Sequence, residues 1–139
     1  MRSFSMLLTA AALVVALFAT DPASADHSNR AEVAAEHWLG LIDAGHYAAS
    51  WRQAAPLFQA KISAAGWTAA LRTARLPFGK VLGRRVATET LARSLPGVPD
   101  GHYAVIRFHT DFAHKAEAGE TVTMDRVAGK WRPIGYFVQ

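Results

Sequence analysis

The sequence contains no cysteine. This absence excludes disulfide bonds, thiolate catalysis, cysteine-ligated metal sites and lipid attachment at a cysteine. The sequence also lacks the glycine-rich motifs that bind nucleotide phosphates and the G-x-S-x-G motif of serine hydrolases. Its six histidines show no spacing typical of a metal site. We therefore expect no cofactor and no metal, and no motif indicates a particular reaction.

Long apolar runs are scarce, and the one that is present lies at the N-terminus. Arg2 precedes an apolar run over Met6–Ala19, and Ala23–Ala25 forms an A-x-A cleavage site. The run is shorter than the roughly 20 residues that span a bilayer. We predict a signal peptide over 1–25, cleaved after its last alanine, and a periplasmic or secreted single domain over 26–139 without a membrane span.

The first half of the predicted domain has the apolar periodicity of amphipathic helices. We predict helices over 29–44, 46–62 and 64–75. Gly45 suits the left-handed position that ends the first helix, and Ser63 suits the cap of the third. Pro56 interrupts the second segment, so we expect a kink or two short helices there. Three tryptophans fall on the inward stripes and are predicted to pack in the core: Trp38, Trp51 and Trp67.

From residue 81 onward the periodicity changes from helical to strand-like. We predict strands over 81–93, 102–112, 120–127 and 130–138. A proline- and glycine-rich turn is expected over 96–101, and a polar loop over 114–119. Pro133 indicates an edge strand or a bulge. Helices first and antiparallel strands afterwards predict an α+β fold, with the N-terminal helices packed on one face of a four-stranded antiparallel sheet.

Arg107, His109 and Asp111 lie at a period of two in the second strand, so their side chains share one face. If that face lined a pocket, His109 could act as a general base oriented by Asp111, and Arg107 could bind a carboxylate. Alternatively, it is the solvent-exposed face of a half-exposed sheet. We favour the second interpretation. The predicted core face of this strand carries Ile106, Phe108 and Phe112.

Asp43, His46 and Tyr47 cluster at the turn between the first two helices. Asp43 is a candidate catalytic carboxylate and Tyr47 a candidate ligand contact, although both also suit structural roles at a helix end. Tyr103 is a further candidate ligand contact. Together with a neighbouring valine on the otherwise polar strand face, it also suggests a homodimer in which two sheets pack face to face.

Basic residues concentrate between the third helix and the first strand: Arg72, Arg75, Lys80, Arg84, Arg85 and Arg93. One interpretation is a patch that binds an anionic lipid, polysaccharide or other acidic partner. The alternative, which we favour, is a solvated helix end and strand edge, where basic residues discourage edge pairing. Nucleic acid is not an expected partner, because the sequence has no nucleic-acid-binding motif.

Several segments are similar to a known family. Residues 35–38 read Ala-Glu-His-Trp, residues 43–51 read Asp-Ala-Gly-His-Tyr-Ala-Ala-Ser-Trp, and residues 95–103 read Leu-Pro-Gly-Val-Pro-Asp-Gly-His-Tyr. With further matches at 108–112 and 129–132, the chain resembles an exported bacterial family catalogued as domain of unknown function 4019. The resemblance covers nearly the whole of 26–139. Pro133 departs from the aliphatic residue expected after Trp-Arg.

The resemblance implies a cone-shaped fold similar to the nuclear transport factor 2 and cystatin-like superfamily, in which helices pack in the cup of a curved sheet. That superfamily includes isomerases, dehydratases and non-catalytic binding domains, so the fold does not choose a function. We expect a non-catalytic domain that binds a small ligand or an envelope protein, with a mostly filled cup. The alternatives are a small lyase or isomerase using a polar residue in the cup, and a structural homodimer.

Overall fold

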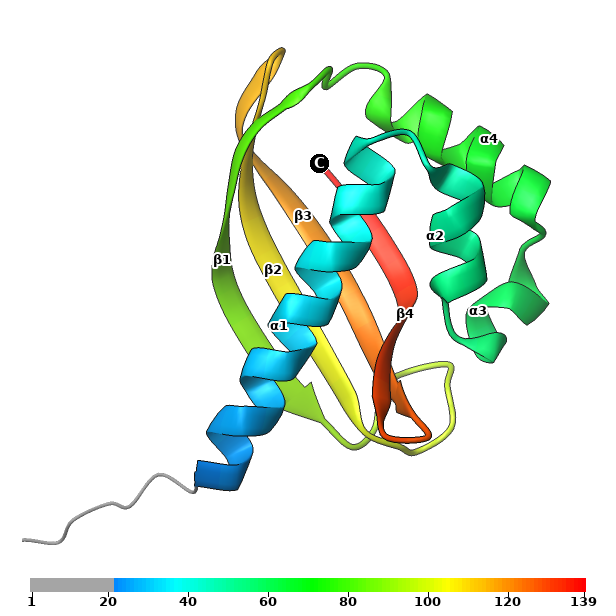
Figure 1. The fold of residues 1–139 in the computed structure, drawn as a ribbon, viewed down its shortest axis with the longest axis vertical. Helices are drawn as coiled ribbons and strands as arrows, with labels where there is room; N and C mark the ends of the chain where they lie inside the picture. The colour runs from blue at the N-terminus through cyan, green and yellow to red at the C-terminus, as the bar shows by residue number, and fades with distance from the viewer. Residues whose placement is uncertain (1–21) are drawn as a thin grey trace, which may run out of the picture.

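The computed structural model describes residues 22–139, so residues 1–21 of the predicted signal peptide lie outside it. Helices precede four strands, as predicted, and the second predicted helical segment is divided into two short helices (Figure 1). The helices are α1 (Pro22–Asp43), α2 (Tyr47–Gln53), α3 (Pro56–Lys61) and α4 (Ala64–Arg75). The strands are β1 (Val81–Ala92), β2 (Tyr103–Phe112), β3 (Lys115–Val127) and β4 (Lys130–Val138). No helix within the described part of the chain is long and apolar enough to cross a membrane.

The local signals at the helix ends act as the sequence predicts. Gly45 has a φ of 79° after the end of α1, and the Ser63 hydroxyl accepts a hydrogen bond from the amide of Gly66 at the start of α4. Pro56 occupies the first turn of α3 and separates it from α2, because proline starts a helix well but cannot continue one. The start of α1 was predicted too late: the helix already includes residues 26–29.

The strands form one antiparallel sheet in the order β1-β2-β3-β4. The predicted polar loop over 114–119 is wrong, since β3 begins at residue 115 and pairs with β2 from there. Ala118 in this segment is fully buried opposite Thr110. This buried alanine packs on the inner side of the sheet, so the otherwise polar segment 115–119 can form part of β3.

Pro133 lies in β4, which is an edge strand, and next to a register shift between Thr123 and Met124 of β3. Both features predicted for this proline are therefore present. Its carbonyl accepts a hydrogen bond of 2.9 Å from the amide of Ala55, between α2 and α3. The irregular strand thus connects the small helices to the sheet.

The core lies between α1 and one face of the sheet, while α2, α3 and α4 pack beside α1 near β4 (Figure 1). We call the α1-covered face the inner face and the opposite one the outer face. Trp38 and Trp67 stack with their ring centroids 6.0 Å apart, and the Tyr136 ring meets both edge-on. Large side chains thus fill most of the space between helices and sheet, as predicted. The buried residues of α1 and the sheet include Leu39, Ile42, Ile106, Phe108, Val122 and Met124.

Ser50 organises the polar atoms of the tryptophan core. Its carbonyl accepts from the Trp38 indole and its hydroxyl accepts from the Trp67 indole, both at 2.9 Å. The hydroxyl also donates to the carbonyl of Tyr47 at 2.6 Å. A fully buried serine therefore satisfies two buried indole donors, which gives this residue a structural role.

Candidate functional site

Four charged side chains from four different elements meet at one end of the inner face. Asp43, at the end of α1, accepts from Arg75 of α4 at 2.9 Å and from Arg84 of β1 at 2.8 Å. Arg84 also donates to Glu120 of β3 at 2.8 Å. We call these four residues the ionic network. It ties the C-terminal ends of α1 and α4 to the sheet.

Glu120 is the buried centre of this network. Its side chain is 0% exposed. Besides Arg84, the hydroxyl of Thr110 donates to it at 2.5 Å, and the hydroxyl of Tyr136 donates to its other oxygen. Burial, followed by the neighbouring negative charge of Glu120, raises the pKa of Tyr136 above its ordinary value. The phenol is therefore held as a hydrogen-bond donor.

Arg75 is less completely satisfied than Arg84. Its side chain is 9% exposed, and its guanidinium lies 4.9 Å from the centre of the Phe112 ring. Nη2 binds Asp43, but Nε and Nη1 are buried without a hydrogen-bond acceptor. Nη1 is 3.9 Å from a Glu120 oxygen, beyond hydrogen-bonding distance. The guanidinium thus keeps unused donors.

An open groove of about 540 Å³ lies above this end of the molecule. We call it the mouth groove. Its lining includes Asp43 and Arg75 of the ionic network, Tyr47, Leu76, and two further basic residues, Arg72 and Lys80. Its volume lies within the usual range for small-molecule sites. The candidates Asp43 and Tyr47 are thus brought together at one groove.

The sequence reasoning missed Glu120, Thr110 and Tyr136 as members of this site. A signal was nevertheless present for Glu120, which is in phase with the buried residues Val122 and Met124 of the same strand. A carboxylate at an inward strand position needs buried partners. Which partners it finds depends on distant elements, so periodicity alone could not have named them.

Arg107, His109 and Asp111 do not line a pocket at the mouth. They lie on the outer face, which none of the helices α1 to α4 covers (Figure 1). Asp111 accepts from the backbone amide of Glu117 at 2.8 Å, and Arg107 and His109 are exposed. Their placement agrees with the favoured interpretation, a strand face open to solvent, and gives no support to the pocket interpretation.

The predicted basic patch does not form one surface. Arg75 and Arg84 turn inward to the carboxylates of the ionic network, because charges beside a core require compensation. Arg85 lies on the outer face and pairs with Glu117 at 3.0 Å. Arg72 and Lys80 remain exposed at the mouth groove. Of the predicted patch, Arg72 and Lys80 therefore carry the positive charge that no described carboxylate pairs with at this end.

Tyr103 is 3% exposed although it lies on the outer face. Its hydroxyl donates to the carbonyl of Pro99 at 2.5 Å, and the turn before β2 closes over its ring. This turn within the same chain accounts for its burial. Tyr103 therefore provides no indication of a dimer interface.

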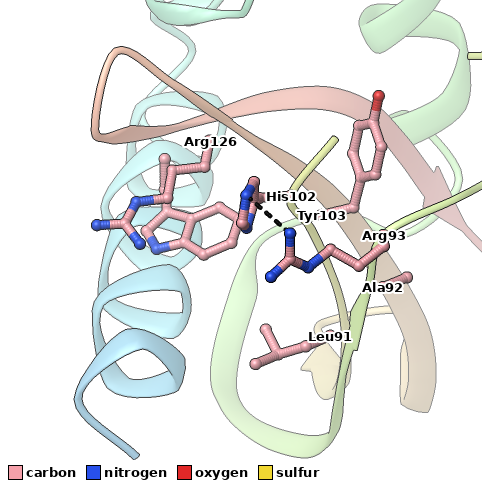
Figure 2. Close-up of a pocket in the computed structure, with 7 residues that line it drawn as sticks. Leu91, Ala92, Arg93, His102, Tyr103 and Arg126 are labelled. Atoms are coloured by element: carbon pink, nitrogen blue, oxygen red, sulfur yellow. Dashed lines mark hydrogen bonds between the residues drawn. The ribbon is translucent and has the colours of Figure 1, made fainter. Parts of the chain in front are cut away.

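A second cavity, of about 360 Å³, lies at the other end of the sheet. We call it the far pocket. Figure 2 shows Arg93 and His102 joined by a hydrogen bond, with Arg126 on a neighbouring strand and the Tyr103 ring turned away from that pair. Leu91, Ala92 and Trp131 complete the lining. None of the residues that line this cavity is acidic.

Residues 22–139 contain no group of three histidine or acidic side chains arranged to hold a metal ion. Comparison with curated proteins finds no match to the chain. Comparison with family models finds one over residues 34–136, described as a protein of unknown function (DUF4019). This match spans α1 to β4 and includes the ionic network. The chain therefore belongs to the DUF4019 family.

Proposed function

We propose that this protein is an exported, non-catalytic binding domain whose ligand enters the mouth groove. The observation that carries the proposal is Arg75. It lines an open groove, yet two of its buried nitrogens lack an acceptor. An unsatisfied buried donor costs about 1–3 kcal/mol. A ligand oxygen that reaches the guanidinium after a small rotation would recover that energy.

The ionic network favours binding over acid–base catalysis. A general base needs a free lone pair within reach of the substrate. Glu120 is fully buried and already accepts from Arg84, Thr110 and Tyr136. Asp43 accepts from two arginines. Both carboxylates are therefore used to hold cations in place.

The rim of the groove indicates the class of ligand. Arg72 and Lys80 form no ion pair with another described residue, so their charges are available to an anion. Leu76, at the same rim, is 81% exposed, and Ile42, Tyr47 and Val81 add apolar surface. A cationic rim beside apolar walls suits an amphipathic carboxylate, such as a fatty acid.

Ligand binding can be tested by thermal shift of residues 26–139 with a series of medium- and long-chain fatty acids. We expect at least one to raise the melting temperature in a concentration-dependent way. The double variant Arg72→Gln/Lys80→Gln should lose that shift. The matched control Arg85→Gln/Arg107→Gln removes two positive charges from the outer face and should keep it. A shift lost equally in both variants, or absent for every fatty acid, would contradict the proposal.

Export and a distant fold relationship are parts of the same proposal. Export is supported by the apolar run and the A-x-A pattern of residues 1–25. Similarity to the nuclear transport factor 2 superfamily is supported by the order of elements, with helices on one side of an antiparallel sheet. N-terminal sequencing of the protein from a periplasmic extract or culture medium should yield Asp26 as the first residue. An intact N-terminus in a cytoplasmic fraction would contradict export.

A further inference from the structure

Each strand or its adjoining turn contributes at least one residue to the far pocket. Arg93 follows β1, His102 precedes β2, Arg126 lies near the end of β3 and Trp131 near the start of β4. The antiparallel meander brings these four positions to the same end of the sheet. Backbone hydrogen bonds hold them together: Gly101 donates to Arg93, and Arg126 donates to His102, at 2.8 and 2.9 Å. We call these four residues the basic row.

The basic row continues the inner face of the sheet beyond its apolar part. Leu91 pairs with Ala104, Ala104 pairs with Met124, and Met124 pairs with Pro133. This preceding row is apolar throughout. Two residues further along each strand, the same face carries two arginines, a histidine and a tryptophan. The change from apolar to basic is abrupt, and it coincides with the cavity.

The basic row has no negative charge of its own. No acidic residue lines the pocket, and neither Arg93 nor Arg126 forms an ion pair with another described residue. Asp125, the nearest acidic residue along β3, alternates to the outer face, where it is paired in register with Arg132; its carboxylate interacts electrostatically with His102 but forms no ion pair with Arg93 or Arg126. Arg93, after β1, and Arg126, in β3, lie on either side of His102, so their two positive charges repel each other across it. The row thus carries an electrostatic cost that a bound anion would offset.

Two contacts hold the cations in place without neutralising them. Nη1 of Arg93 lies 3.2 Å from Nε2 of His102, which can accept this hydrogen bond when the imidazole is neutral. The guanidinium of Arg126 lies 5.9 Å from the centre of the Trp131 ring, in a cation–π contact. Each arginine is therefore positioned by a neutral group. Both keep N–H donors for a further acceptor.

We propose that the far pocket binds the dianionic phosphate of a phosphomonoester. A phosphate offers several acceptor oxygens and up to two negative charges, which match two guanidiniums and an imidazole better than a single carboxylate does. The cavity is large enough for a phosphate together with a small organic group. The phosphate could belong to a soluble ester or to a lipid headgroup. This site is separate from the mouth groove and does not depend on its function.

The experiment uses residues 26–139 and titrates glycerol 3-phosphate by isothermal calorimetry at constant ionic strength, with amide resonances of Arg93, His102 and Arg126 followed by NMR. We expect saturable binding and shifts confined to these resonances and their neighbours. Arg93→Gln and Arg126→Gln should each weaken binding about tenfold or more. The matched control is Arg107→Gln, which removes an exposed arginine from the outer face and should change affinity by less than about twofold.

Parallel titrations separate the possible sources of the anion. Vesicles containing phosphatidic acid, compared with phosphatidylglycerol vesicles, test for a lipid phosphomonoester, and acetate tests for a carboxylate. Preferential binding of either phosphomonoester supports the proposal and identifies its source. Equal affinity for acetate, no saturable binding of either phosphomonoester up to about 10 mM, or an equal loss in Arg107→Gln would overturn it. Circular dichroism of each variant verifies that the fold is retained.

Discussion

The two ends of the inner face use arginine in opposite ways. At the mouth, Arg75 and Arg84 meet the carboxylates of Asp43 and Glu120, so the network carries no net charge. At the far pocket, Arg93 and Arg126 lie beside a histidine and a tryptophan without a carboxylate. The same residue type therefore supports the fold at one end and provides unneutralised charge at the other.

Solvent access explains this difference. The side chains of Arg75 and Arg84 are 9% and 11% exposed, and an uncompensated charge at that depth is costly. Arg93 is exposed and Arg126 is half-buried, so water can solvate their positive charges, which no carboxylate neutralises. A buried arginine must be paired for the chain to fold. A solvent-accessible arginine at the end of the sheet can stay unpaired in the folded protein and remain available to a ligand.

Removing the buried carboxylate of Glu120 should have the largest effect on the difference between the two ends. Glu120→Ala leaves Arg84 without its buried partner, and we expect the free energy of unfolding to fall by about 3–5 kcal/mol. Urea denaturation would measure the loss. Glu117→Ala removes the exposed partner of Arg85 and should cost no more than about 1 kcal/mol. Similar losses in the two variants would show that burial does not distinguish the pairs.

A smaller effect is expected at the half-open edge of the ionic network. Asp43→Asn keeps the shape of the side chain but removes the charge that Arg75 and Arg84 share. Because the Asp43 side chain is 23% exposed, water replaces part of the interaction, and we expect a loss of about 1–3 kcal/mol. A loss as large as that of Glu120→Ala in the same urea assay would contradict this ranking.

High pH should lower the free energy of unfolding through ionisation of Tyr136, which lies beside the ionic network. Burial and Glu120 raise the pKa of Tyr136 in the folded protein above its unfolded value of about 10. The protonated phenol therefore contributes its full stability below about pH 10, and this contribution is lost as the pH rises from there toward the folded pKa. Unfolding free energies from pH 8 to 11 should fall more steeply for the wild type than for Tyr136→Phe. Parallel curves would contradict the prediction.

The smallest effect, and the one opposite in sign, is expected at the far pocket. Without ligand, Arg126→Gln removes one of several neighbouring cations, so the free energy of unfolding should stay unchanged or rise by up to about 1 kcal/mol. Adding glycerol 3-phosphate should stabilise the wild type more than this variant at the same ligand concentration. A clear destabilisation of the ligand-free variant would mean that Arg126 serves the fold, as Arg75 does.

Much of the architecture was predictable from local pattern. The spacing of apolar residues located the helices and the strands, and Pro56, Gly45 and Ser63 placed the breaks. The loop over 114–119 was mispredicted because its polar composition outweighed the single buried position at Ala118. Of the candidate site, Asp43 and Tyr47 were found because they are close in sequence.

The sequence by itself determined the α+β order, the inner and outer faces of β2, and the content of the core, because all of these follow from short-range periodicity. Only the tertiary structure decided which basic residues are neutralised. Asp43 is far along the chain from Arg84 and Glu120, and the ionic network forms only when α1, α4, β1 and β3 pack together. Whether a charged side chain is neutralised depends on which groups lie near it in the folded protein, and local sequence patterns do not specify those long-range neighbours.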